Sequence, residues 1–554
     1  MSGERLIYLP LGGAGEIGMN AYVYGWGAPG KERLILVDLG VAFPDMESTP
    51  GVDLILPDMA WLKERADKLE AVFVTHAHED HVGGVAHSHE ALGAPVYARA
   101  FTANIARRKM ADLGLPEDSV RTVSPWPEQV QVGPFKVGFL PMSHSIPESA
   151  ALVIDTPAGR VIHSGDFKLD PTPIVGEPFD PDLWAEVSKG GVRALICDST
   201  NVFSPLPGRS EISVGPAIEA LVGEASGMVV ATTFASNVAR LKTLAEAGQR
   251  AGRSIVLLGR AMRRMVEAAV ETGVLTDFPS VISPEDAQDI PRDHLMLLVT
   301  GSQGERRAAS AQLSRGKYNG LELKEGDLFL FSSKTIPGNE KGVIRIINAL
   351  SEKGVDVVDD SSAYHVSGHA NRPDLEQIHG IVRPQMLIPM HGEHRHLREH
   401  AKLAEAGGMQ SAVVVNGMMM DLTGNAPVVA EYIESGRTYL DGTVQIGAMD
   451  GVVRDRIRMA LNGHVMVSVI VDEEDELLGD PWCEIMGLPE TGSSRAPLID
   501  VLEADLSQFV GRANPKTLSD DDALEEALRR IVRQTAQGEI GKKPEVTVVI
   551  SRLS

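Results

Sequence analysis

One short stretch of the chain, THAHEDHVGG at residues 75–84, concentrates side chains that bind metal ions. His76, His78, Asp80 and His81 form an HxHxDH motif that follows an apolar run. If that run is a strand, its period of two places His76 and His78 on one side. Imidazole and carboxylate groups together suit zinc, with manganese or iron as substitutes. A solvated polar loop is the alternative interpretation, and the rest of the chain decides between the two.

Two metal ions need more ligands than this motif contains. Three further residues each follow an apolar run and have small neighbours that let a cation approach closely: His144, Asp166 and His391. Each one alone is more commonly a hydrogen-bonding or capping residue. Together with the HxHxDH motif they favour a metal site built from distant parts of the chain.

The elements that must position these residues follow a pattern of alternating strands and helices. Six apolar runs predict buried strands, at residues 33–40, 71–78, 160–167, 194–200, 296–302 and 386–393. Five of them end at an Asp or a His, and in layered α/β folds ligands collect at strand ends. Helical spacing of apolar residues at 236–249, 259–272 and 340–354 completes the α/β pattern.

The bulk composition is that of a globular protein with several domains. The chain has 554 residues, 43% hydrophobic and 23% charged, and its two cysteines exclude a disulfide framework. It shows no secretory signal and no apolar stretch of membrane-spanning length, so we expect a cytoplasmic protein without a membrane partner. A net charge of −24 disfavours nucleic-acid binding, but residues 201–360 are nearly neutral and bound cations would add positive charge.

After about residue 440 the sequence changes character. Residues 441–450 are rich in Gly and lack periodicity, which predicts a linker. A strand pattern at VMVSVIV, a helix over 520–537 and a final strand at PEVTVVISRL predict a small α+β domain.

The candidate ligands resemble the full ligand set of the metallo-β-lactamase superfamily. By this resemblance His76, His78 and His144 hold one metal, while Asp80, His81 and His391 hold the other. Asp166 bridges the two ions, and Asp38 in LVDLG supports the site from behind. The resemblance implies two Zn²⁺ ions per subunit, with Mn²⁺ or Mg²⁺ as substitutes.

The chain between Asp198 and about residue 365 resembles the β-CASP insertion of nucleic-acid-processing members. ICDST matches its acidic motif at Asp198, SGHA matches its histidine motif at His369, and PMHGE supplies the third motif at His391. The stretches LGGAGEIGMN, FASN, FSSKTIPGNE and HVSGHANRPDL resemble the bacterial ribonuclease J family along essentially the whole chain.

The resemblance implies an α/β fold: a metallo-β-lactamase αββα sandwich with an inserted β-CASP α/β domain and a small C-terminal α+β domain. The expected boundaries are 1–205 with 361–440 for the sandwich, 206–360 for the insertion, 441–450 for the linker and 451–554 for the last domain.

The implied activity is hydrolysis of single-stranded RNA. The family trims RNA from a 5′-monophosphate end and also cuts internally, in RNA maturation and decay. Asp166 belongs to the catalytic centre, His369 is the expected general acid, and Asp198 orients it. The expected phosphate-binding residues are His365, Val366, Ser367, Gly368, His369, Ser333, Lys334 and Arg240.

Two other functions stay open. A lactonase or thioesterase on the same fold would not need the insertion, and a non-catalytic scaffold would not need all seven ligand positions filled. The resemblance also implies a homodimer or homotetramer with RNA-decay partners. The sequence does not give the balance of exonuclease and endonuclease activity, the metal in cells, the RNA targets or any additional structural cation.

Overall fold

The computed structural model describes residues 3–553, which form two compact units. The first unit combines residues up to 42 with residues 56–437, and the second combines residues 43–55 with those from 438 onward. Among the described residues, none of the helices is both long and apolar enough to cross a membrane.

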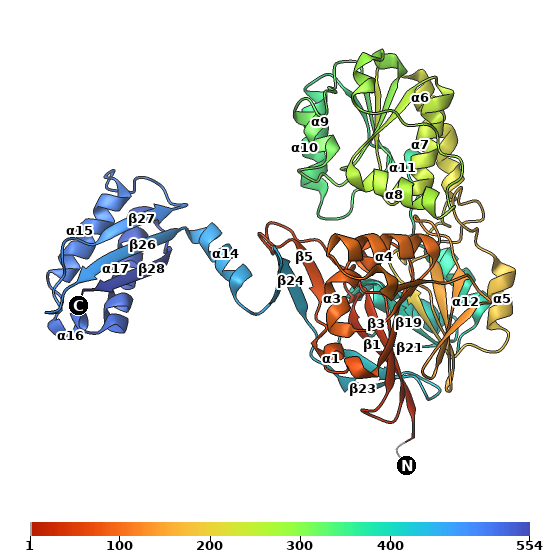
Figure 1. The fold of residues 1–554 in the computed structure, drawn as a ribbon, viewed down its shortest axis with the longest axis horizontal. Helices are drawn as coiled ribbons and strands as arrows, with labels where there is room; N and C mark the ends of the chain where they lie inside the picture. The colour runs from red at the N-terminus through yellow and green to blue at the C-terminus, as the bar shows by residue number, and fades with distance from the viewer. Residues whose placement is uncertain (1–2, 554) are drawn as a thin grey trace. The chain divides into compact units, whose positions relative to one another are not determined.

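The core of the first unit lies between two large β-sheets (Figure 1). In spatial order, the first sheet contains β23 (Val428–Tyr432), β22 (Met418–Asp421), β1 (Arg5–Gly12), β3 (Ala21–Gly27), β4 (Arg33–Val37), β6 (Leu69–Val74), β7 (Val96–Ala98) and β8 (Val120–Thr122). The second contains β21 (Gln410–Ser411), β19 (Met386–Met390), β13 (Ala194–Asp198), β12 (Gly159–His163), β11 (Ala150–Thr156), β10 (Phe135–Pro141) and β9 (Gln129–Val132). Apolar side chains of both sheets, such as Phe73 and Ile154, pack between them.

Helices cover the outer faces of these two sheets. On the first sheet lie α3 (Val85–Leu92) and α4 (Ala100–Asp112), whose Val85 and Phe101 pack with strand residues. On the second sheet lie α5 (Pro181–Ser188), α12 (Arg372–Val382) and α13 (His394–Ala406). The four layers confirm the expected αββα sandwich.

A separate parallel sheet is inserted between β13 and β19. Its order is β15 (Ser254–Leu258), β16 (Leu295–Val299), β14 (Val229–Thr232), β17 (Leu328–Phe331) and β18 (Asp356–Val358), and all its pairings are parallel. The helices around it are α6 (Gly215–Glu224), α7 (Val238–Arg250), α8 (Arg260–Glu271), α9 (Ala309–Arg315) and α10 (Glu340–Ser351). The helices expected at 236–249, 259–272 and 340–354 and the strand expected at 296–302 therefore belong to an α/β insertion, whereas the other five expected strands belong to the sandwich.

The second unit contains a small three-stranded sheet. Strand β26 (His464–Val471) lies between β27 (Trp482–Met486), its antiparallel neighbour, and β28 (Glu545–Arg552), its parallel neighbour. Leu residues of α15 (Leu498–Val510) and α17 (Asp521–Ile540) pack with the buried valines of β26. This agrees with the expected small α+β domain.

The segment expected as a linker contains regular structure. Within residues 441–450, β25 (Val444–Gly447) pairs with β24 (Arg437–Asp441) in an antiparallel hairpin. The backbone N–H of Asp53 donates to the carbonyl of Leu440, so residues 43–55 pack with this hairpin. The pairing joins segments far apart in sequence, which local periodicity does not reveal.

Candidate metal centre

Three histidines converge at the end of β6. His76 and His78 follow this strand with the expected spacing of two, and His144 follows β10 of the other sheet. His78 Nδ1 lies 3.1 Å from His76 Nε2 and 3.0 Å from His144 Nε2. These three imidazoles therefore form one group of potential metal ligands.

A second group of donors lies beside the first. Asp80 and His81 belong to the short helix α2 (Glu79–Val82), and His391 follows β19. His391 Nε2 lies 3.2 Å from Asp80 Oδ2, and His81 Nε2 lies 3.2 Å from Asp166 Oδ2. All four side chains bring a ligand atom into one cluster.

Asp166 lies between the two groups. Its Oδ2 is 3.9 Å from His76 Nε2 and 4.0 Å from His144 Nε2, and its Oδ1 is 3.0 Å from His391 Nδ1. The structure thus brings together all seven residues that the sequence singles out, and it places Asp166 where one carboxylate can reach both groups.

Asp38 fixes the second group from the protein side. Its Oδ2 lies 2.7 Å from His81 Nδ1, and its Oδ1 accepts from the backbone N–H of Thr75 at 2.8 Å. The contact to Nδ1 leaves Nε2 of His81 for the cluster, which is the usual way in which a protein orients a histidine ligand.

Two of these residues hold an unusual backbone conformation. Asp38 has φ of 60° and His391 has φ of 47°, both in the left-handed region that non-glycine residues seldom adopt. Gly40 permits a close approach nearby, because a Cβ there would lie 1.7 Å from the carbonyl oxygen of Asp80. Such strain persists where the surroundings fix it, as they do at functional sites.

Burial and neighbouring charges divide the histidines into two kinds. Burial lowers the pKa of His78 to about 4 and holds the pKa of His76 and of His144 well below the usual value. Burial also opposes the charge on His81, but the carboxylates of Asp166, Asp80 and Asp38 outweigh it and raise its pKa to about 10. The first group is therefore a set of neutral imidazoles, whereas the second is strongly coupled to carboxylates.

The predicted acid and its partner are in contact. His369 Nδ1 lies 2.7 Å from Asp198 Oδ2, and also 3.9 Å from Asp166 Oδ2. Burial lowers the pKa of His369, but the charge of Asp198 and its hydrogen bond outweigh this effect and leave the pKa above its ordinary value. His369 is thus held beside the candidate metal ligands in a setting that favours its protonated form.

Asn201 is a residue that the sequence reasoning missed. Its Nδ2 donates to Ser367 Oγ at 2.8 Å, to the carbonyl of His369 at 3.3 Å and to Asn371 Oδ1 at 3.0 Å. It thereby holds the loop that carries His369. Its position three residues after Asp198 was the only sequence signal, and that spacing is not distinctive.

The other predicted loop residues lie around the same segment. His144 Nδ1 is 2.5 Å from the carbonyl of Gly368, and a Cβ on Gly368 would lie 2.8 Å from the His144 ring. Only glycine therefore allows this approach. Val366 is buried, and Ser367 Oγ accepts from the backbone N–H of His369 at 3.1 Å.

A small hollow of about 230 Å³ lies at the end of β17 in the insertion. Ser333 and Lys334 line it together with Asp359 and Ser361. His365 is half-buried; desolvation, then the charges of Arg240, Lys168 and Lys334, lower its pKa to about 3. These residues thus offer hydroxyl, ammonium and imidazole groups within one region of the fold.

Arg240 is buried, whereas a residue that binds phosphate directly is expected at the surface. Its side chain is 0% exposed, and its Nε donates to Glu211 Oε1 at 2.7 Å. The guanidinium also donates to the carbonyls of Ser332 and Tyr364 at 3.0 and 2.8 Å. Its charge is already offset, and its observed contacts hold the chain just before His365. A direct phosphate contact by Arg240 stays a prediction that would need this pair to open.

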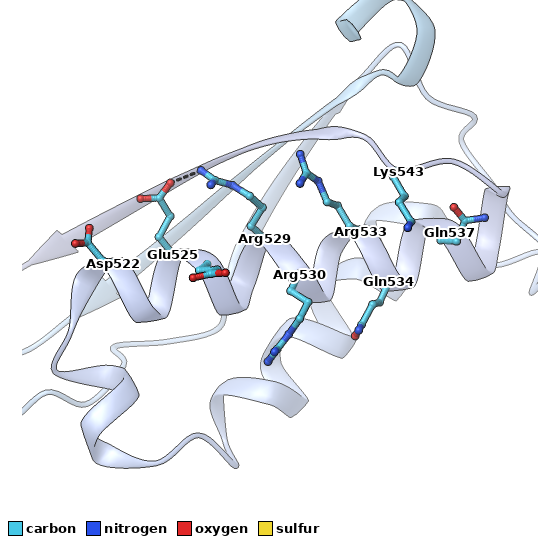
Figure 2. A pocket seen from close by; sticks show the side chains of 9 residues that line it. Asp522, Glu525, Arg529, Arg530, Arg533, Gln534, Gln537 and Lys543 are labelled. Atoms are coloured by element: carbon cyan, nitrogen blue, oxygen red, sulfur yellow. Dashed lines mark hydrogen bonds and ion pairs between the residues drawn. The ribbon is translucent and has the colours of Figure 1, made fainter. Parts of the chain in front are cut away.

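The second unit carries a hollow of a different kind. It has a volume of about 850 Å³ along α17, and Arg529, Arg530, Arg533 and Lys543 line it together with acidic side chains (Figure 2). Glu525 already pairs with Arg529. Its lining contains no histidine or cysteine, so it offers none of the chemistry found in the first unit.

Known protein families match four stretches of the chain. The metallo-beta-lactamase superfamily matches residues 15–194, the ribonuclease J beta-CASP domain 226–350, the Zn-dependent metallo-hydrolase RNA specificity domain 354–415 and the ribonuclease J C-terminal domain 451–553. A solved structure of a protein of unknown function from Enterococcus faecalis V583 aligns with a TM-score of 0.53 at 17% identity, covering 75% of this chain and 100% of that one. That likeness shows the fold alone.

Curated relatives match along nearly the full length. Ribonuclease J of Sinorhizobium meliloti is 41% identical over 556 residues, which cover 99% of this chain and 98% of the relative. Ribonuclease J of Synechocystis is 34% identical, with 99% of this chain and 87% of the relative covered. With its metal-ligand clusters and its matched domains, the chain belongs to the ribonuclease J family of metal-dependent ribonucleases.

Proposed function

We propose that this site hydrolyses the phosphodiester bonds of single-stranded RNA with two Zn²⁺ ions, for which Mn²⁺ or Mg²⁺ can substitute. His76, His78 and His144 would hold one ion, Asp80, His81 and His391 would hold the other, and Asp166 would contact both. The observation that carries the proposal is the juxtaposition of these two donor groups with the His369–Asp198 pair.

The donor atoms fit metal ions on chemical grounds. His78 Nδ1 faces both His76 Nε2 and His144 Nε2 at hydrogen-bond distance. One ring nitrogen either donates or accepts, so it can satisfy only one of these two contacts. Burial also disfavours charged imidazoles here, as the lowered pKa values of all three show. A cation bound by the three lone pairs would remove this conflict, and neutral imidazoles with carboxylates suit zinc.

The protein's own residues supply positioning and a proton. When bound, the metal ions lower the pKa of water and offset the negative charge that builds on the phosphoryl oxygens. His369 donates a proton to the departing 3′ oxygen, which prevents an unstable alkoxide from leaving. Asp198 keeps Nδ1 of His369 engaged, so that Nε2 carries the transferable proton. Asn201 holds the loop so that this ring stays beside Asp166.

We further propose that the enzyme works from 5′ to 3′ and favours 5′-monophosphate ends, with endonuclease activity as well. The 365–369 loop and the hollow at Ser333 and Lys334 would bind the terminal phosphate through hydroxyl, backbone N–H and ammonium groups. Arg240 would act mainly by holding the start of this loop. A cytoplasmic homodimer or homotetramer with RNA-decay partners is the expected setting, on the strength of the family resemblance.

The decisive experiment compares three versions of one RNA that differ only at the 5′ end: monophosphate, triphosphate and hydroxyl. We expect the purified enzyme to release nucleoside monophosphates fastest from the first. The His369→Ala variant, tested at equal metal content, controls for a contaminating nuclease. Equal rates on all three RNAs would refute the end preference, and no RNA hydrolysis by a metal-loaded enzyme would refute the activity itself.

A further inference from the structure

A second buried cluster of metal-ligating side chains lies on the outer side of the second sheet. Cys197 is in β13, and because side chains alternate along a strand it points away from the face used by Asp198. It packs among residues of α12 and α13, the helices that carry His379 and His400. Cys197 and His400 are 0% exposed and His379 is 6% exposed, so none of the three is a surface residue.

The potential ligand atoms of this cluster face one another. Nε2 of His379 lies 3.0 Å from Nε2 of His400, and the two rings are stacked at 9°. The thiol of Cys197 joins them, with all three ligand atoms within 4.8 Å of one another. The nitrogen-to-nitrogen distance matches the 3.0 and 3.1 Å seen among His76, His78 and His144. The two imidazole nitrogens are therefore as close as those of the first donor group, although these rings are stacked and those of the first group meet edge to face.

Ser199 orients one of these histidines. Its hydroxyl donates to the carbonyl of Cys197 at 3.3 Å, and its Oγ lies 2.9 Å from His400 Nδ1. When the hydroxyl proton is given to the Cys197 carbonyl, Oγ accepts from Nδ1–H, and Nε2 of His400 then carries a lone pair that faces His379. Histidine ligands of metals are commonly oriented in this way, by a hydrogen bond to the nitrogen that does not bind the metal.

We propose that Cys197, His379 and His400 form a zinc-binding site that is separate from the catalytic metal centre. One thiolate and two imidazoles suit Zn²⁺, and three protein ligands leave a fourth position for water. Binding releases the thiol proton to solvent, and the proton shared between the two Nε2 atoms moves to Nδ1 of His379, so that both rings stay neutral and offer a lone pair. The ion would tie the end of β13 to α12 and α13, one residue before Asp198, and so support the strand that carries it. A simple His379–His400 hydrogen bond is the competing explanation.

The first test counts metal ions in full-length protein stripped with chelator, reloaded with ZnCl₂ and desalted. We expect Cys197→Ser and His379→Gln each to bind one equivalent less than the wild type. Cys483→Ser is the matched control, because Cys483 is also buried but belongs to no His cluster in the part of the chain that the structure describes. It should bind as much zinc as the wild type.

The same zinc count is repeated in a protein that carries both Asp80→Ala and His144→Ala. Weakening the catalytic centre in this way should leave the zinc at Cys197 bound. Adding Cys197→Ser should then remove it. This arrangement distinguishes failure of the new site from failure of the proposed catalytic centre.

The second test identifies the sulfur ligand. Protein reloaded with CoCl₂ should show a near-ultraviolet thiolate-to-cobalt charge-transfer band in the wild type and in Cys483→Ser, and no band in Cys197→Ser. If Cys197→Ser does not fold, His379→Gln decides, through loss of one zinc equivalent with an unchanged circular dichroism spectrum. Equal zinc content in the wild type and His379→Gln, or no thiolate band in the wild type, would overturn the proposal in favour of the hydrogen-bonded pair.

Discussion

The carboxylate of Asp198 lies 2.7 Å from Nδ1 of His369, although 170 residues separate them in the chain. Asp198 ends β13, and His369 belongs to the loop that follows the inserted sheet. The insertion therefore returns the chain to the strand end from which it departed. This contact fixes the ring and favours its protonated form, which is the form that the proposed general acid requires.

Asp198→Asn tests this contact. We expect the cleavage rate to fall by about 10²- to 10⁴-fold, the usual contribution of a positioned general acid, because the amide carries no charge to hold the protonated ring. Single-turnover RNA cleavage measures the rate, and metal content measured in parallel should be unchanged. A wild-type rate in the metal-loaded variant would show that His369 does not depend on Asp198.

Asp80→Ala and His81→Ala test the metal centre. Both should abolish RNA cleavage and lower the metal content while the protein stays folded, because each removes a donor atom from the second group. Glu79→Gln is the matched control in the same turn: Glu79 pairs with Lys109 at 2.6 Å and belongs to neither donor group. Cleavage at the wild-type rate by either alanine variant would count against the metal assignment.

Asp38→Asn tests whether the contact between Asp38 and His81 Nδ1 orients His81 as a ligand. Asp38 contacts His81 Nδ1 and the backbone of Thr75 but no other donor of the cluster, so its loss should loosen one ligand without deleting it. We expect the metal affinity to fall by about 10- to 100-fold. Competition with a chromophoric chelator measures the affinity, and the predicted role would be wrong if the affinity matched that of the wild type.

Glu211→Gln tests the buried charges between the sandwich and the insertion. Glu211 Oε1 accepts from Arg240 at 2.7 Å, and Lys168 lies 3.8 Å from its other oxygen. Removing the carboxylate leaves Arg240 buried without a counter-charge, which should lower the free energy of unfolding by about 3–5 kcal/mol.

The exposed pair Arg250–Glu219 supplies the control for this change. Glu219→Gln should alter the free energy of unfolding by no more than about 1 kcal/mol, because solvent screens that pair. Denaturant unfolding compares the two variants. Equal effects would mean that burial does not make the Glu211 contact special.

His163 predicts a specific dependence of stability on pH. It is fully buried beside Tyr24, with Nδ1 2.9 Å from the hydroxyl, and burial lowers its pKa to about 3. Between about pH 6.5 and pH 3 the His163 ring is protonated in the unfolded chain but neutral in the folded chain. Stability therefore falls as the pH drops below about 6.5, by up to about 1.4 kcal/mol per pH unit for this one group.

Replacing the ring removes this effect. The stability of His163→Asn should decline less steeply between pH 7 and pH 5 than that of the wild type, even if the variant is less stable at every pH. Denaturant midpoints at several pH values measure both slopes. Parallel slopes would show that His163 does not contribute.

Much of the site could be predicted from the sequence because short motifs contain the residue types that its chemistry requires. The HxHxDH spacing identifies ligand types, and apolar runs that end at Asp or His indicate strands whose ends could meet. The alternation of strands and helices, with the resemblance of SGHA and PMHGE to known motifs, was enough to anticipate the sandwich, the insertion and the C-terminal domain.

Only the tertiary structure decided which polar residues face the site and which lie buried. Arg240 was expected from the sequence to bind phosphate, but it pairs inside the protein with Glu211. Asn201 donates to the carbonyl of His369 and holds that loop, although no distinctive motif marks it. Cys197, His379 and His400 are scattered in the sequence and meet across a strand and two helices. A short stretch of sequence determines which side chains are present and, along a strand, which way they point. Which of them are buried, and with which residues they pair, depends on packing between segments that are far apart in the chain.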